Sequence, residues 1–160
     1  MAIRDTLRLL LIGLAVGAAA PSPAPRMTDG TGAVAALPKP AIVLLWAAWC
    51  APCRAEVRDF ATLEKAAGKT PLIVVSIEGG SRAQSLLSNV PPTRQRFPAD
   101  AKADILAAYP ETRGALPFAM AISKDGRTCV SHAGAVDAAT IAQWRDRCGQ
   151  LACAGSAPGC

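Results

Sequence analysis

The apolar residues in the first half of the chain follow a strand-helix-strand pattern. Residues 41–46 form an unbroken apolar run with β-branched members, which is typical of a strand covered on both faces in a parallel sheet. After Cys50 the apolar residues recur every three or four positions, which predicts a helix that ends at Gly68. A second buried strand is predicted over residues 71–77. Together these segments predict one β-α-β unit with a right-handed crossover.

The middle of the chain has weaker patterns. Ser81 is a candidate N-cap for a short helix that runs to about Ser88. We expect residues 89–98, which contain two adjacent prolines, to form a loop. Residues 100–109 are expected to form a further helix.

A hairpin and a helix are predicted near the C-terminus. Two strand-like runs, LPFAMAIS and RTCVSH, flank Asp125 and Gly126, a dipeptide that favours a tight turn. Residues 137–148 have helical spacing, with Asp137 as the expected N-cap. The order of the elements predicts an α/β fold in which helices flank a central mixed sheet on both faces.

The N-terminus indicates export. Residues 1–20 place two arginines before an uncharged stretch that ends in small residues, which is the layout of a secretory signal peptide. The stretch is shorter than the roughly 20 residues that span a bilayer, so we expect its removal, with an uncleaved membrane anchor as the alternative. A proline-rich linker over residues 21–40, one domain over residues 41–147 and a cysteine-containing tail over residues 148–160 complete the predicted organisation. We expect a periplasmic or otherwise exported protein.

Composition narrows the classes of function. The chain has 160 residues, enough to bury a core without cross-links, and we expect a monomer. Its 17 basic and 12 acidic residues give a net charge of +5, but the basic residues are scattered. We therefore expect no nucleic-acid partner. Six cysteines in a chain bound for an oxidising compartment make disulfides the default expectation.

Two of these cysteines are spaced for thiol chemistry. Cys50 lies where the strand gives way to the helix, and the positive end of a helix dipole lowers the pKa of a thiol. We predict that Cys50 is the exposed nucleophile and that Cys53, one turn later, is the more buried resolving thiol. Pro52 suits the first turn of a helix, and the small Ala51 leaves the sulfur approachable.

The motif WAAWCAPCR resembles the active site of the thioredoxin superfamily, and LLWAAWCAPCRAEV is similar to exported TlpA-like thiol:disulfide oxidoreductases. A second match, GALPFAMAISKDGR, lies downstream, so the resemblance covers residues 41–147. It implies a thioredoxin-like fold and a cis bond between Leu116 and Pro117 that faces the dithiol, with backbone groups of Leu116 binding the substrate. We expect five residues to bind the substrate: Trp49, Ala51, Pro52, Leu116 and Pro117. Trp49 would supply a flat contact surface.

The resemblance also implies a function. The protein is expected to reduce disulfides in protein substrates without a cofactor, and a membrane electron donor is expected to reduce it again. Many thioredoxins keep a buried acid and a nearby lysine that assist the inner cysteine, but the matching positions here are the apolar Leu44 and Val74. Glu78, at the end of the second strand, is the candidate proton relay in their place. Glu56 is expected to lie on a solvated helix face.

The remaining cysteines, Cys129, Cys148, Cys153 and Cys160, are candidates for structural disulfides. Cys148 lies on the apolar stripe of the last helix, where it could meet Cys129 of the hairpin. Four cysteines allow three pairings, and the sequence does not choose between them. A relay dithiol in the tail is the alternative.

Other interpretations of the Cys50–Cys53 pair are weaker. A disulfide across so short a loop removes little chain entropy, so a purely structural role is disfavoured. We expect no metal site, because the spacings of the other possible zinc ligands match no common zinc finger. The principal alternative is a copper-binding chaperone that uses the same pair with His132 and Met120. A partner-binding domain without catalysis is the third possibility.

Overall fold

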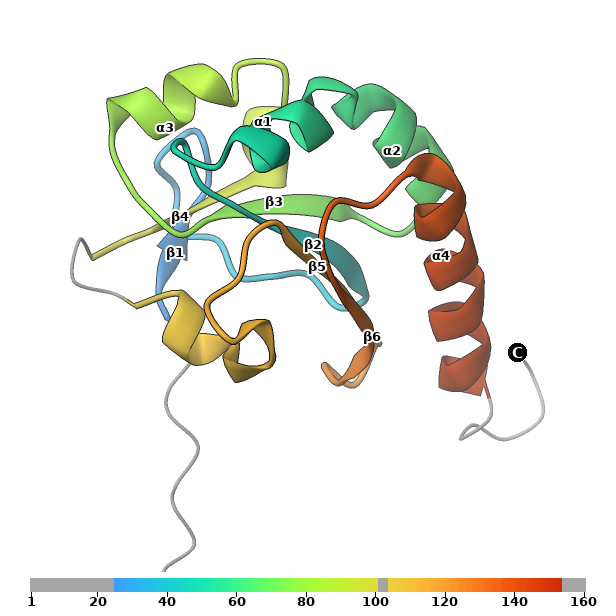
Figure 1. Cartoon of the computed structure of the whole chain (residues 1–160). Helices are drawn as coiled ribbons and strands as arrows, with labels where there is room; N and C mark the ends of the chain where they lie inside the picture. The colour runs from blue at the N-terminus through green and yellow to red at the C-terminus, as the bar shows by residue number, and fades with distance from the viewer. Residues whose placement is uncertain (1–24, 101–103, 154–160) are drawn as a thin grey trace, which may run out of the picture.

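A computed structural model describes residues 25–100 and 104–153 of the chain (Figure 1). The expected signal peptide at residues 1–20 and Cys160 lie outside these ranges, and the side chain of Cys153 is not described. No helix in the two described stretches combines the length and the apolar character that a membrane crossing requires.

The centre of the molecule is a mixed six-stranded sheet with the order β1-β4-β3-β2-β5-β6. The parallel pairs are β2 with β3 and β3 with β4, and the other pairs are antiparallel. The strands are β1 (Met27–Thr28), β2 (Ala41–Trp46), β3 (Leu72–Ser76), β4 (Gln95–Pro98), β5 (Phe118–Ile122) and β6 (Thr128–Ala133).

Four α-helices and three 3-10 helices surround the sheet in the described part of the chain. The α-helices are α1 (Ala51–Arg58), α2 (Phe60–Ala67), α3 (Ser81–Leu86) and α4 (Ala138–Cys153). The 3-10 helices are η1 (Pro92–Arg94), η2 (Leu106–Ala108) and η3 (Pro110–Thr112).

The predicted β-α-β unit is confirmed. Strands β2 and β3 are parallel, and Leu44 lies opposite Val74 in their register. The continuous apolar run of β2 is explained by its central place, because all six of its residues are buried. The single predicted helix is interrupted at Asp59, which separates α1 from α2. Gly68 ends α2 with a φ of +64°, a conformation that glycine adopts without a Cβ clash.

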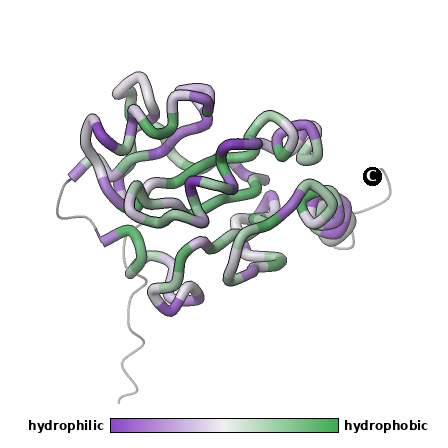
Figure 2. The backbone as a smooth tube through the Cα atoms, turned by 45° about the horizontal axis from the view of Figure 1, so that its top comes forward, coloured by the Kyte–Doolittle hydropathy of each residue, from purple (hydrophilic) through white to green (hydrophobic). Residues whose placement is uncertain are grey.

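The sheet separates two clusters of buried apolar side chains. One cluster takes alternate residues of β2, including Leu44 and Trp46, together with residues of all four α-helices. The other takes the intervening residues of β2 together with Met27 and Ile105, and Leu37, Leu106 of η2 and Tyr109 pack against it. Figure 2 shows apolar positions concentrated in the central strands. Helices therefore lie on both faces, as predicted, but on the second face the described residues form 3-10 helix and no α-helix.

The weakly patterned middle of the chain differs from the prediction. The expected loop at residues 89–98 contains η1 and β4, because Phe97 is buried and Gln95 donates side-chain hydrogen bonds to two backbone carbonyls. The helix expected over residues 100–109 is limited to the 3-10 helix η2 within the described residues. Gly80, not Ser81, is the N-cap of α3.

Two predicted boundaries also need correction. The linker expected over residues 21–40 is folded where the structure describes it, because Met27 is buried and β1 pairs with β4. The expected tail also begins inside a helix, since α4 continues to Cys153. The hairpin of β5 and β6 is confirmed, with Gly126 at a φ of +84° in its turn.

The cap of α4 is as predicted, since the Asp137 carboxylate accepts a hydrogen bond of 2.8 Å from the Thr140 N–H. We expect Asp137→Ala to lower the midpoint of urea unfolding without changing the slope, because an N–H at the start of α4 loses its acceptor. Asp137→Asn keeps an oxygen acceptor and should unfold near the wild-type midpoint. Equal midpoints for Asp137→Ala and wild type would contradict this role.

Candidate active site

Cys50 occupies the N-cap of α1, directly after the turn that leaves β2. The Cys50 N–H donates to the Ala47 carbonyl at 3.1 Å, which closes this turn. Cys50 has an extended backbone, with φ −81° and ψ 100°, and the helix begins at the next residue. Pro52 lies in the first turn, where its missing N–H costs no helical hydrogen bond. The local sequence therefore places the first sulfur at the positive end of α1, as predicted.

The two sulfurs are joined as a disulfide, so the structure represents the oxidised form. The Cys53 N–H donates to the Cys50 sulfur at 3.2 Å. Cys53 is 0% exposed and Cys50 is 4% exposed. The order of accessibility agrees with the prediction, but the expected exposure of Cys50 is wrong in this oxidised form. Cys50 belongs to the apolar cluster that also contains Trp46 and Cys53.

The surface around the disulfide is supplied by its neighbours in the sequence. Trp49 is 65% exposed, and Ala51 and Pro52 are exposed as well. A groove of about 400 Å³ begins at Ala51 and is lined by Arg54, Arg58 and Leu86. An apolar rim and a basic groove therefore adjoin the disulfide.

The predicted cis bond between Leu116 and Pro117 is confirmed. Pro117 is buried, and its carbonyl accepts a hydrogen bond of 2.8 Å from the Gly134 N–H. Leu116 is half-buried, and among the described residues its N–H and carbonyl have no hydrogen-bond partner. The N–H and the carbonyl of Leu116 are therefore available for a further hydrogen-bond partner.

Glu78 reaches the active-site turn from the end of β3. Its Oε1 accepts a hydrogen bond from the Ala48 N–H, two residues before Cys50. Its backbone is held by Ser76, whose hydroxyl donates to the Glu78 carbonyl at 2.6 Å. Glu78 therefore fixes the turn that carries Cys50, which is a positioning contact.

Glu56 is the functional candidate that sequence reasoning missed. It was expected on a solvated face, but it is only 8% exposed, and its Oε1 accepts a hydrogen bond of 2.7 Å from the Val136 N–H. Burial raises the pKa of Glu56 to about 7. Glu56 lies three residues after Cys53, and residues at this spacing share one face of a helix. This spacing from Cys53 was the signal in the sequence that could have identified Glu56.

The other predicted cysteines are partly accounted for. Cys129 and Cys148 are close together but carry free thiols in the structure. No group of three or more metal-ligating side chains occurs in the described ranges. Met120 belongs to the apolar cluster on the opposite face of the sheet from Cys50 and Cys53, so it does not join them as a copper ligand. His132 is exposed on β6.

The arrangement matches solved structures of one fold. The thioredoxin-related protein from Neisseria meningitidis serogroup B superposes with a TM-score of 0.64 at 21% identity, over 78% of this chain and 98% of that one. A secreted Mycobacterium tuberculosis disulfide oxidoreductase homologous to E. coli DsbE superposes with a TM-score of 0.58 at 18% identity, over 76% of this chain and 93% of that one. StoA from Bacillus subtilis superposes with a TM-score of 0.58 at 19% identity, over 74% of this chain and 93% of that one.

The fold is therefore thioredoxin-like, with a Cys-x-x-Cys disulfide at the start of α1, as predicted. Its structural neighbours include thiol:disulfide oxidoreductases of the DsbE type. No family model and no curated protein matches the sequence.

The buried Glu56 carboxyl makes stability depend on pH. Its pKa is about 7 in the fold against 4.5 for an unperturbed glutamate, so the folded state holds the proton more tightly. This contribution is complete below about pH 4.5 and is lost as pH rises through 7, by at most about 3 kcal/mol. We expect urea titrations to show this fall in the free energy of unfolding.

The matched variant is Glu56→Gln, which keeps an acceptor for the Val136 N–H but does not ionise. Its stability should exceed that of the wild type at pH 8 and should not fall between pH 5 and 8. A parallel pH dependence in both proteins would show that Glu56 is not the responsible group.

Proposed function

We propose that this protein is an exported thiol:disulfide oxidoreductase that reduces disulfides in protein substrates. The observation that carries the proposal is the Cys50 sulfur at the N-cap of α1, where it accepts a hydrogen bond from the Cys53 N–H. An N–H that points at a sulfur favours the thiolate, which is the reactive form. The disulfide oxidoreductases among the structural neighbours support the same class of reaction.

The reaction begins with the reduced pair. The Cys50 thiolate attacks one sulfur of a substrate disulfide, the substrate S–S bond breaks, and the other substrate sulfur leaves as a thiolate. Cys50 and the substrate are then joined by a mixed disulfide. Two features favour Cys50 over Cys53 for this step. The Cys53 N–H points at the Cys50 sulfur, and Cys53 itself is fully buried.

The second step releases the substrate. Cys53 loses its proton and attacks the Cys50 sulfur, which forms the intramolecular disulfide and expels the second substrate thiolate. Two electrons have then passed to the substrate, leaving the enzyme in the oxidised form that the structure represents. A thiol-bearing electron donor at the membrane would reduce the pair for another cycle.

The buried Cys53 thiol needs a proton acceptor, and two carboxyl groups compete for this role. Glu56 lies on the same helix one turn after Cys53, and its pKa of about 7 suits proton exchange near neutral pH. Glu78 is the acceptor expected from the sequence, but it lies beyond the end of β3 and its carboxylate binds the Ala48 N–H of the turn before Cys50, not a group on the helix that carries Cys53. We favour Glu56 as the acceptor and Glu78 as a positioning residue.

The substrate would meet the protein on the surface around the disulfide. Trp49, Ala51 and Pro52 supply an exposed apolar rim, and the free backbone groups of Leu116 could pair with an extended segment of the substrate. Arg54 and Arg58, beside this rim, have no ion pair within the described residues, so they favour acidic substrate segments.

Export is supported by the signal-like residues 1–20. Two structural neighbours are a secreted oxidoreductase and an exposed lipoprotein thioredoxin from Streptococcus pneumoniae. The same residues would either be removed or hold the protein at the membrane near its electron donor.

The exchange mechanism predicts different defects for the two cysteines. Cys50→Ser should abolish reduction of insulin disulfides, whereas Cys53→Ser should form a mixed disulfide with insulin that is not released. Mass spectrometry of the protein before and after treatment with a reductant detects this adduct. Insulin turnover that persists in Cys50→Ser, or the absence of an adduct with Cys53→Ser, would refute the proposed roles.

The two carboxyl groups can be separated by the pH dependence of turnover. A proton acceptor with a pKa of about 7 must be ionised, so the wild-type rate should rise through pH 7. Glu56→Gln should remove this rise and reduce the rate at pH 7 on the order of 10- to 100-fold. Glu78→Gln, the matched control, should retain it. Loss of the rise only in Glu78→Gln would instead make Glu78 the relay.

A further inference from the structure

Two cysteines that the proposed reaction does not use meet between the hairpin and the last helix. Cys148 lies on the buried face of α4 and is 7% exposed, whereas Cys129 is half-buried on β6. The two thiols lie close enough for Cys129 to contribute to the raised pKa of Cys148. Both belong to or pack against the apolar cluster that contains Ile141 and Trp144 of α4.

An irregularity in the hairpin directs Cys129 toward the helix. Ala121 pairs with Val130, but the next residue, Ile122, pairs with Thr128, so Cys129 has no partner on β5. In a regular strand Cys129 and Val130 would face opposite sides of the sheet. Here both pack against the same cluster. The extra residue of a β-bulge commonly changes the direction of a side chain. In this hairpin the bulge turns the Cys129 thiol toward α4.

We propose that Cys129 and Cys148 form a second disulfide, which fastens the β5–β6 hairpin to α4. One small-molecule disulfide, such as oxidised glutathione, supplies the oxidising equivalents. The Cys129 thiolate attacks it and releases one thiol, and Cys148 then attacks the Cys129 sulfur and releases the second. The two cysteines lose two protons and two electrons, and one disulfide becomes two thiols.

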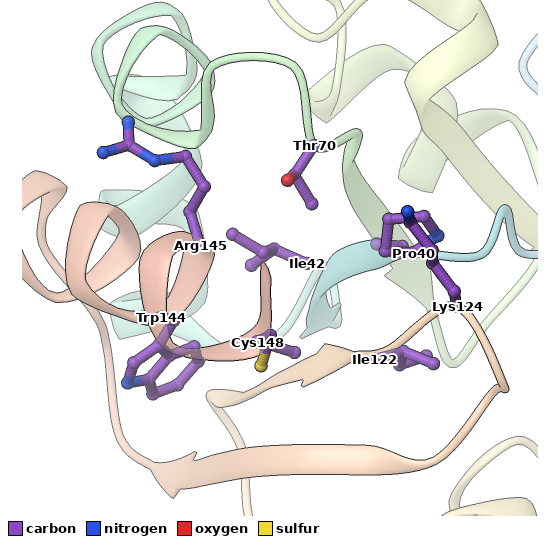
Figure 3. Close-up of a pocket in the computed structure, with 10 residues that line it drawn as sticks. Pro40, Ile42, Thr70, Ile122, Lys124, Trp144, Arg145 and Cys148 are labelled. Atoms are coloured by element: carbon purple, nitrogen blue, oxygen red, sulfur yellow. The ribbon is translucent and has the colours of Figure 1, made fainter. Parts of the chain in front are cut away.

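The position of the pair separates it from the active site. Cys148 lines a cavity of about 40 Å³ together with Ala41 and Ile42 at the start of β2 (Figure 3). Cys50 follows the other end of the same strand. Since a strand rises about 3.3 Å per residue, the six residues of β2 separate the two pairs by roughly 17 Å. The Cys50–Cys53 disulfide therefore cannot exchange directly with Cys129 or Cys148 of the same molecule.

The same surroundings make this bond a static cross-link. Burial and the neighbouring Cys129 raise the pKa of Cys148 to about 12. A thiol with so high a pKa is a poor leaving group, so an outside thiol that attacks Cys129 displaces Cys148 slowly and the bond, once formed, is reduced slowly. The active-site disulfide can then cycle while the cross-link persists.

The pairing can be mapped on the full chain after export to a bacterial periplasm. Free thiols are blocked with N-ethylmaleimide before lysis, and the unreduced protein is digested with trypsin and chymotrypsin. Cleavage after Arg127, Trp144, Arg147 and Leu151 isolates each cysteine of the pair from the others. We expect the peptide 128–144 joined to the peptide 148–151, with a mass 2 Da below that of the two free peptides.

Recovery of Cys129 and Cys148 as blocked thiols, or of either joined to another cysteine, would overturn the proposal. Graded dithiothreitol should reduce the Cys50–Cys53 bond at least roughly tenfold faster than the Cys129–Cys148 bond. Equal rates would overturn the assignment of a static cross-link.

Variants provide an independent test by stability. Cys129→Ala, Cys148→Ala and the double variant should show the same loss in Tm, on the order of 5–10 °C, because each removes the same bond. Losses that add in the double variant would indicate separate packing effects and contradict the disulfide. Insulin reduction should be unchanged in all three, so failure of this inference is distinguishable from failure of the proposed function.

Discussion

The hydrogen bond from the Cys53 N–H to the Cys50 sulfur is the interaction on which the site depends. It exists because β2 ends at Trp46, a short turn follows, and α1 begins immediately after Cys50. The helix then presents its unpaired N–H groups to the sulfur at its N-cap. A cysteine elsewhere on the helix would lack this donor and would behave as an ordinary buried thiol. In the proposed reaction, the reactivity of the pair therefore comes from backbone geometry, not from a charged side chain between the cysteines.

Contacts that are distant in the sequence hold this geometry in place. Glu78 at the end of β3 binds the Ala48 N–H of the active-site turn, and Glu56 binds the Val136 N–H in the segment that precedes α4. The first contact anchors the turn to the parallel strand pair, and the second anchors α1 to the C-terminal part of the fold. Carboxyl groups thus link the start of α1 to both halves of the molecule, and in Glu56 the same burial raises the pKa toward neutrality.

The sequence predicted the elements whose apolar pattern is local and strong. Strand β2, strand β3, the hairpin and the cap at Asp137 follow from periodicity and turn residues. Strand β4 was missed because its burial depends on Gln95, a polar residue whose side chain is satisfied only by carbonyls brought together in the fold. Glu56 was missed because its partner lies 80 residues away, although its spacing from Cys53 was visible. The burial of Cys50 depends on its packing in the apolar cluster of the folded chain, which composition does not reveal.

The most direct test of the account is the pH dependence of Cys50 alkylation in reduced Cys53→Ser, which retains the backbone N–H at residue 53. Iodoacetamide reacts with the thiolate, so its rate against pH reports the pKa of Cys50 in the native fold. We expect a midpoint clearly below the value of about 8.5 for a free cysteine. A midpoint at or above that value, or a sulfur that reacts only after unfolding, would contradict it.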